Sequence, residues 1–95
     1  MTAVTDNTER RRFELEEGGL TAFADYRQNG EVLMLPHVEA PPALRGTGAA
    51  GRLMEGVAAH ARERGLKLLP VCPYAVAWLR RHPEHAELVR GSTLP

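Results

Sequence analysis

The chain has a single cysteine, Cys72, and no excess of charge of either sign. One thiol cannot close an internal disulfide, and disulfides are typical of secreted proteins, so we expect a reducing, cytoplasmic location. Twelve Lys and Arg residues balance twelve Asp and Glu residues. Proteins that bind nucleic acids or membrane surfaces through charge need a basic excess. The balance therefore predicts neither a nucleic acid nor a membrane as a partner.

Long apolar runs are also absent. No run approaches the roughly 20 residues that span a bilayer, and the polar segment 1–12 lacks the apolar core of a signal peptide. With 43% hydrophobic and 25% charged residues, the 95 residues have the composition of one globular domain with a modest core. We therefore expect a single domain over 1–95, with flexible ends at 1–10 and 90–95.

Three segments in the first half have the patterns of β-strands. Phe13 and Leu15 alternate with charged residues, and apolar residues also alternate with others over 20–27. The segment 31–36 is apolar more continuously. Short turns that contain glycine join the three segments. The pattern predicts an antiparallel meander.

The period changes to that of a helix over 48–64. Gly65 follows where a glycine commonly ends a helix, and 66–71 is apolar on both faces, as in a covered strand. A strand, a helix and a second strand form a βαβ unit with parallel strands. Pro70 has no N–H to donate, so we infer that the two strands part at this end. The predicted buried stripe of the helix is Ala50, Leu53, Met54, Val57, Ala58 and Ala61.

A second helix is predicted over 74–82, where Pro83 ends it. Its packed side is expected to carry Tyr74, Ala77 and Trp78. The fold class that follows is α/β: an antiparallel meander leads into a βαβ unit with two splayed parallel strands, and a C-terminal helix completes the domain.

The glycine-rich segment 45–51 connects the third strand to the first helix. Glycine has no Cβ, so main-chain N–H groups near Gly46 and Gly48 can turn toward a ligand. The first turn of a helix adds free N–H groups and a partial positive charge. Together these features form a site for an anion, most often a phosphate or pyrophosphate. A tight strand-to-helix connection without a ligand is the alternative.

The run Arg45-Gly46-Thr47-Gly48-Ala49-Ala50 resembles the R-x-x-G-x-[G/A] signature of the GNAT acetyltransferase superfamily. The flanking segments resemble the small YjdJ-type domains of that superfamily, and the resemblance covers about 13–89. These segments are 37–42, 65–74 and 81–85. Two positions depart from the pattern: Val38 replaces a threonine, and Ala50 replaces the last glycine, which the signature tolerates.

The resemblance implies a GNAT-like fold that binds acetyl-CoA and transfers its acetyl group to a primary amine within a ternary complex, without a metal. It places the pyrophosphate on the main chain of the glycine-rich segment and the pantetheine arm along the strand that contains 37–39. The implied coenzyme-binding residues are Val38, Arg45, Gly46, Thr47, Gly48, Ala49, Ala50 and Gly51. The alternatives are a module that binds acyl-CoA without turnover and, more distantly, a protein-interaction domain.

Acetyl transfer needs a deprotonated amine and a proton for the departing thiolate. His37 and Glu39 share one face of an extended segment, so either can accept the amine proton, directly or through water. The alternative is an ordinary ion pair with a neighbouring arginine at the end of the strand. Cys72 lies at the end of the second parallel strand, where ligands of open α/β sheets bind. Its thiol can protonate the thiolate or carry the acetyl group, a role that the resemblance favours over simple burial.

Other candidate residues carry weaker signals. Tyr74 is expected to pack rather than to donate a proton, and Arg45 lies either near a phosphate or in an ion pair elsewhere. His82 and His85 lack the paired cysteines of a zinc motif, so we expect no metal site. The sequence leaves the acceptor open among a polyamine, a small amine and a protein lysine. We take a monomer as the working expectation.

Overall fold

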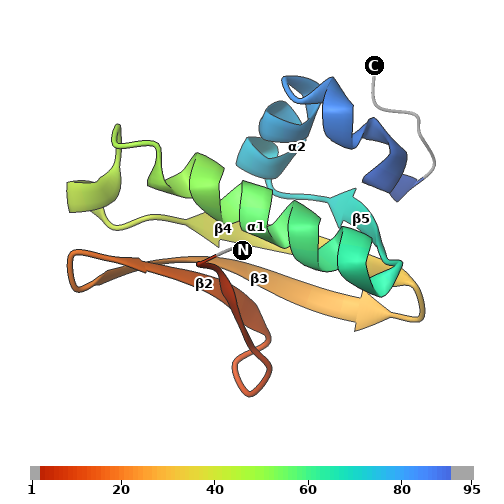
Figure 1. Cartoon of the computed structure of the whole chain (residues 1–95), viewed down its shortest axis with the longest axis horizontal. Coiled ribbons are helices and arrows are strands. Elements are labelled where there is room, and N and C mark those ends of the chain that lie inside the picture. The colour runs from red at the N-terminus through yellow and green to blue at the C-terminus, as the bar shows by residue number, and fades with distance from the viewer. Residues whose placement is uncertain (1–2, 91–95) are drawn as a thin grey trace.

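The computed structural model describes residues 3–90, in which one five-stranded sheet lies against helices (Figure 1). The strands lie in the order in which they occur in the chain; the first four are antiparallel and the last pair is parallel. The predicted meander that leads into a βαβ unit is therefore confirmed. The elements are β1 (Thr5–Asn7), β2 (Arg12–Glu17), β3 (Leu20–Asn29), β4 (Val32–Glu39), the 3-10 helix η1 (Pro42–Leu44), α1 (Ala49–Arg64), β5 (Lys67–Pro70), α2 (Pro73–Arg80) and the 3-10 helix η2 (Pro83–Leu88).

The N-terminal segment differs from the prediction. Thr5–Asn7 forms β1 and pairs with β2, and Val4 beside it is only 4% exposed. The hydroxyl of Tyr26 donates a 2.6 Å hydrogen bond to Asp6, which ties this strand to β3. For residues 3–10 the expected flexibility is thus corrected, because Thr5–Asn7 adds a fourth antiparallel strand to the meander. The expected flexible residues 1–2 and 91–95 lie outside the described residues.

The core lies between α1 and the sheet, with α1 running lengthwise along β4 and β3 in Figure 1. The predicted stripe of α1 is confirmed except at its start, where Ala49 is buried and Ala50 only half-buried. Burying one leucine side chain contributes about 1.5–3 kcal/mol, so the facing side chains supply much of the stability. The side chains from the sheet that face α1 are Phe13, Leu15, Ala22, Ala24, Leu33, Leu35 and Leu68.

The two ends of α1 are set by glycines. Gly65 adopts the left-handed conformation (φ 69°), and its N–H bonds the carbonyl groups of the last helical turn. This confirms the predicted C-cap. Gly48, at the other end, also has a positive φ of 87°. A residue with a Cβ is strained in this conformation, so glycine is favoured at both ends.

α2 packs beside α1, on the same side of the sheet (Figure 1). Its buried residues are Ala75, Trp78 and Leu79, so the predicted packed side is correct for Trp78 but not for Ala77. The reason is that these three positions, at i, i+3 and i+4, are the ones that face α1 and β5. Tyr74 is half-buried and packs against the core cluster, as expected.

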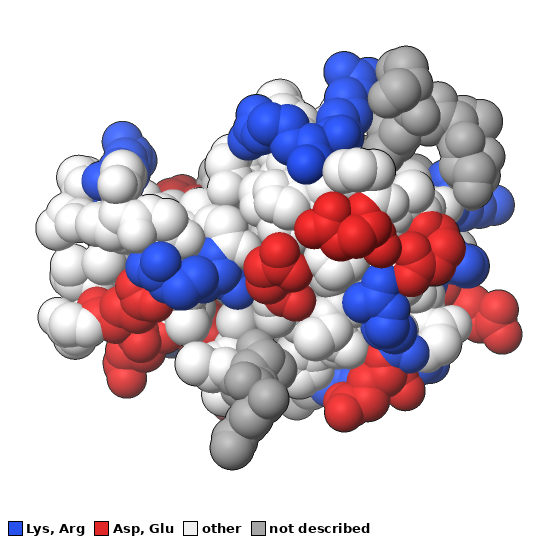
Figure 2. All heavy atoms as spheres, turned by 45° about the horizontal axis from the view of Figure 1, so that its top comes forward, with Lys and Arg blue, Asp and Glu red and all other residues white. Residues whose placement is uncertain are grey.

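The described helices all lie on one side of the sheet, and no described helix covers the other face of the strands (Figure 1). Neither α1 nor α2, the α-helices of the described residues, combines the length and the apolar character needed to cross a bilayer. Figure 2 shows the helical face, where basic and acidic side chains alternate with uncharged surface. In this view no single sign of charge dominates, in agreement with the net charge of zero.

Candidate functional site

The parallel strands β4 and β5 separate halfway along β4. Their ladder runs from Val32↔Lys67 to Leu35↔Pro70, and β4 then continues to Glu39. Beyond the ladder, the carbonyl of Leu35 accepts bonds from the N–H groups of the two residues that follow β5, at 3.1 and 3.0 Å. The chain then turns away into α2. The predicted splaying of the two strands is thus confirmed.

A β-bulge lies at the same point of β4. The register with β3 shifts between Asp25↔His37 and Arg27↔Met34, so two residues of β4 lie opposite Tyr26. These are Leu35 and Pro36. A bulge reverses the alternation of side chains along the strand that carries it. Sequence analysis missed this feature, and the signal that indicates it is a proline inside an apolar strand.

The reversal decides how Val38 is oriented. Before the bulge, Leu33 and Leu35 face the core; after it, Val38 and Ala40 pack toward the core. Residues on one face of a strand present N–H and C=O to the same edge. The carbonyl of Leu35 points to the β5 edge, so the main chain of Val38 points there too. β3 pairs with this part of β4 on the other edge, but no described strand pairs with it on the β5 edge. We call residues 36–39 the open edge.

The main chain after η1 turns sharply through two glycines. Gly46 and Gly48 have φ angles of +81° and +87°, in the left-handed region. A Cβ on Gly48 would lie only 3.0 Å from Nη1 of Arg52. The side chain of Thr47 fixes the turn, because its hydroxyl donates a 2.6 Å hydrogen bond to the carbonyl of Leu44. Backbone conformation therefore explains both glycines, and the close approach of Arg52 adds a second reason at Gly48.

Three N–H groups of the segment 45–51 are bonded within the chain. The N–H groups of Arg45 and Thr47 donate to the carbonyls of η1, both at 3.2 Å, and that of Ala49 donates to the hydroxyl of Thr47 at 3.3 Å. The other four have no partner among the described residues, and we call them the cradle amides. They belong to Gly46, Gly48, Ala50 and Gly51.

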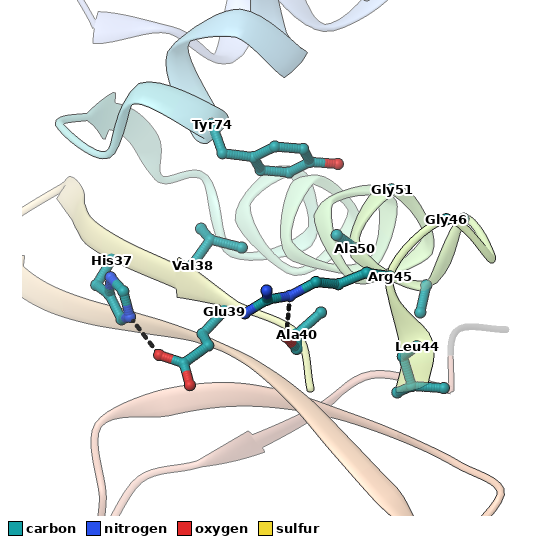
Figure 3. Close-up of a pocket in the computed structure, with 12 residues that line it drawn as sticks. His37, Val38, Glu39, Ala40, Leu44, Arg45, Gly46, Ala50, Gly51 and Tyr74 are labelled. Carbon is teal, nitrogen blue, oxygen red and sulfur yellow. Dashed lines mark hydrogen bonds and ion pairs between the residues drawn. The ribbon is translucent and has the colours of Figure 1, made fainter. Parts of the chain in front are cut away.

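The cradle amides and the open edge border one pocket of about 570 Å³ (Figure 3). The open edge contributes one wall, the glycine turn and the first turn of α1 form another, and Tyr74 of α2 lies opposite β4. The first turn of α1 contains no acidic residue. The positive end of the helix dipole therefore faces the pocket without an internal counter-charge, which favours an anion there.

Arg45 extends from the glycine turn along the pocket toward β4 (Figure 3). Its Nε donates a 3.1 Å hydrogen bond to the carbonyl of Ala40, and it forms no ion pair with any described residue. The alternative of an ion pair is thus not seen among the described residues, and the place near a phosphate stays a prediction. Burial raises the pKa of Tyr74 above its ordinary value, although Arg81 opposes this. Its hydroxyl therefore stays protonated at neutral pH.

His37 and Glu39 project together from the open edge, on the side of β4 that faces away from α1 (Figure 3). Nε2 of His37 and Oε1 of Glu39 are 2.8 Å apart, and both side chains are about half exposed, at 52% and 51%. The prediction that they share a face is confirmed. A carboxylate paired with an imidazole at a pocket rim can accept a proton from a bound amine.

Two predicted site residues lie apart from this group. Cys72 is 7% exposed, belongs to the core cluster and is not among the residues that line the pocket. Thr47 does not line the pocket either, because its N–H and hydroxyl are used to hold the turn. The pocket brings together the other predicted residues, from His37 to Gly51.

One group of side chains in the described residues has the spacing of metal ligands. It contains Glu55, Glu84 and His85, with ligand atoms within 4.8 Å of one another. Arg62 donates to Nδ1 of His85 at 3.3 Å, so the ring proton is on Nε2, which donates to Glu55 at 2.9 Å. Both ring nitrogens are thus used within the chain. The two carboxylates alone make a poor site for a transition metal.

Comparison with known proteins agrees with this geometry. A family model described as GCN5-related N-acetyltransferase matches residues 12–88, which is most of the chain. The chain is also similar to the NMR solution structure of a GCN5-like protein from Staphylococcus aureus. The TM-score is 0.67 at 21% sequence identity, over 96% of this chain and 92% of that one. At this identity the second comparison supports the fold.

Proposed function

The chain belongs to the GCN5-related N-acetyltransferase family, and from this premise we propose that it transfers the acetyl group of acetyl-CoA to a primary amine. The observation that carries the proposal is the set of cradle amides, which line a pocket beside the open edge of β4. The flanking motifs support assignment to the YjdJ-type branch. The alternative is a module that binds acyl-CoA without turnover.

The cradle amides fit a pyrophosphate. Hydrogen bonds to a charged group contribute about 1.5–3 kcal/mol each. The four N–H groups without partners among the described residues belong to residues that line the pocket. The helix N-terminus adds favourable electrostatics. Arg45 supplies one positive charge along the same wall. We therefore assign coenzyme binding to the cradle amides and Arg45.

The open edge fits the rest of the coenzyme. A pantetheine arm contains amide groups, which pair with the main chain of an unpaired strand edge as another strand does. The N–H of Val38 faces that edge, and we assign to it the stabilisation of the oxygen of the thioester carbonyl. Removing one such donor costs about 100- to 1000-fold in rate in other enzymes. The side chain of Val38 takes no part in this role.

The acceptor reaches the thioester from the face that carries His37 and Glu39. The amine nitrogen attacks the carbonyl carbon, the C–S bond breaks, and this pair takes the proton that the amine loses. The departing thiolate needs a proton in return. Cys72 is the predicted donor, and Tyr74 is a second candidate because it lines the pocket and remains protonated.

The function is tested by calorimetry with acetyl-CoA, followed by release of free thiol in the presence of a polyamine, a small amine or a lysine peptide. We expect saturable binding and amine-dependent release. Glu39→Gln should lower kcat about 100-fold and leave the Kd for acetyl-CoA within about twofold, because it removes a proton acceptor but no coenzyme contact. Binding without release by any amine would support the module; no binding at millimolar coenzyme would reject both.

Cys72 has its own test. Cys72→Ala should retain acetyl-CoA affinity and lose most turnover if the thiol moves a proton or carries the acetyl group. Cys72→Ser, which keeps a hydroxyl, separates the two roles, because only proton donation is partly retained. Unchanged turnover in Cys72→Ala would assign the residue to the core, where its burial places it.

A further inference from the structure

Arg52 connects the glycine turn to a distant hairpin. Its Nη1 donates to the carbonyl of Thr47 at 3.2 Å, and its Nε and Nη2 donate to the two carboxylate oxygens of Glu17, both at 2.8 Å. Glu17 ends β2, 35 residues earlier in the chain. Neither residue is among those that line the coenzyme pocket.

The geometry of this contact is that of a specific pair. The guanidinium plane meets the carboxylate through two parallel hydrogen bonds, the arrangement that only arginine forms. The bond to Arg52 lowers the pKa of Glu17, so the pair is ionised at neutral pH. The third bond, to the carbonyl of Thr47, comes from Nη1, which makes no bond to Glu17. Arg52 is therefore held by Glu17 in position to bind the turn.

The bond to Thr47 sets the direction of a cradle amide. The C=O of Thr47 and the N–H of Gly48 belong to one trans peptide unit, so they point in opposite directions. Holding this carbonyl on Arg52 turns the N–H of Gly48 away from Arg52. Gly48 lines the pocket, and its N–H has no partner among the described residues. The missing Cβ of Gly48 also leaves the guanidinium its space, at 3.0 Å.

We propose that Arg52, held by Glu17, is a positioning residue that presets the Thr47–Gly48 peptide so that its N–H faces the anion of the coenzyme. This inference rests on the proposed binding of acetyl-CoA. Preset donors bind more tightly because the chain does not lose conformational freedom when the ligand arrives. Arg52 acts through the peptide and makes no contact with the phosphates.

Glu17→Gln gives the sharpest test, because positioning and simple electrostatics predict opposite signs. Removing a negative charge near a site for an anion should tighten binding if charge alone matters. Positioning predicts that acetyl-CoA binds about five- to tenfold more weakly, with KM raised and kcat unchanged. Arg52→Gln should have the same effect. The double variant should bind acetyl-CoA no more weakly than either single variant, since both substitutions remove the same interaction.

Two further variants complete the test. Glu87→Gln removes a carboxylate from another exposed ion pair of α1, with Arg62, and should leave the Kd unchanged. Arg52→Lys keeps the charge but loses the planar fork, so it should bind as weakly as Arg52→Gln. The amide resonance of Gly48 in the free protein should shift in Glu17→Gln and stay in place in Glu87→Gln.

The outcomes separate this inference from the function on which it rests. Failure of the unaltered protein to bind acetyl-CoA would overturn the proposed function. If the unaltered protein binds, then equal or tighter binding by Glu17→Gln would overturn the role of Arg52 alone. Full affinity in Arg52→Lys would also overturn it, because a point charge would then suffice.

Discussion

The two ends of α1 face the same physical requirement and meet it in different ways. At the C-terminal end, Gly65 and Leu66 donate to carbonyls of the last turn, and the basic residues Arg62 and Arg64 complement the negative end of the dipole. Arg64 in turn donates to Asp6 of β1 at 2.8 Å. At the N-terminal end, the first turn holds no acidic residue and no side-chain cap from its N-cap residue, Gly48.

This difference between the two ends of α1 indicates a binding role for the N-terminal end. Unsatisfied N–H groups at a helix end reduce stability, and proteins usually cap them. This chain completes one end of α1 and leaves the cradle amides at the other without partners among the described residues. The same end borders the pocket. We infer that the open end is kept for an anion from outside the chain.

The largest expected effect comes from giving the open end its own anion. Ala50→Glu places a carboxylate in the first turn, beside the cradle amides. Acetyl-CoA affinity should fall on the order of 100-fold, because two like charges about 4 Å apart near a protein surface repel by several kcal/mol. The free energy of unfolding should rise by about 0.3–1 kcal/mol, through the helix dipole. Calorimetry and denaturant titration measure the two changes.

Ala59→Glu is the matched control. It adds the same charge to an exposed position of the same helix, outside the pocket. Its Kd should stay within about twofold of the unaltered protein. Equal loss of affinity in both variants would mean that net charge, not the open end, determines binding.

The glycines at the two ends of α1 allow a second comparison. Gly48→Ala and Gly65→Ala each force a Cβ into the left-handed region, so each should lower stability by about 1–2 kcal/mol. Only Gly48→Ala should also weaken acetyl-CoA binding, by about tenfold, because it displaces a cradle amide and crowds Arg52. A matching loss of affinity in Gly65→Ala would contradict the assigned difference between the ends.

At the C-terminal end of α1, where Arg64 binds Asp6, we expect a substitution to change stability and not affinity. This carboxylate accepts bonds from Tyr26 and from Arg64, and Asp6→Ala removes both. Stability should fall by about 1 kcal/mol, while the Kd for acetyl-CoA remains the same. Denaturant titration and calorimetry on one preparation test both. A weakened Kd at full stability would show that the two ends are not independent.

The smallest effect appears only at high pH. Burial, together with donation to Asp6, raises the pKa of Tyr26 from 10.0 to about 12. The folded state therefore favours the protonated phenol. Its contribution to stability is complete below about pH 10 and is lost as the pH rises through about 12. Thermal unfolding between pH 9 and 11 should depend less on pH in Tyr26→Phe; an unchanged dependence would place the titrating group elsewhere.

Local signals explain what the sequence could predict of the fold. The helix over 48–64 and its end at Gly65 follow from apolar period and one glycine, and both are present. β1 could not be predicted in this way. It depends on Asp6, whose partners Tyr26 and Arg64 lie 20 and 58 residues away along the chain. No local sequence pattern near Thr5–Asn7 indicates those contacts.

For the candidate site, too, local sequence signals predicted some features, and others depend on contacts made only in the folded chain. The glycine motif located the pocket, and the shared face of His37 and Glu39 followed from their spacing. The sequence did not distinguish bonded from unbonded N–H groups, because that depends on how η1 and the hydroxyl of Thr47 fold against the turn. It also missed the bulge that turns Val38, although Pro36 indicates it. The burial of Cys72 depends on the packing of α2.

The most direct test of the account is an amide nitrogen–proton correlation spectrum of the protein during titration with acetyl-CoA. The account predicts that the resonances of the four cradle amides move most. The neighbouring amides of Arg45, Thr47 and Ala49, which are bonded within the chain, should move less. Saturating shifts elsewhere in the molecule, with the cradle amides unmoved, would contradict the claim that the open end of α1 holds the coenzyme.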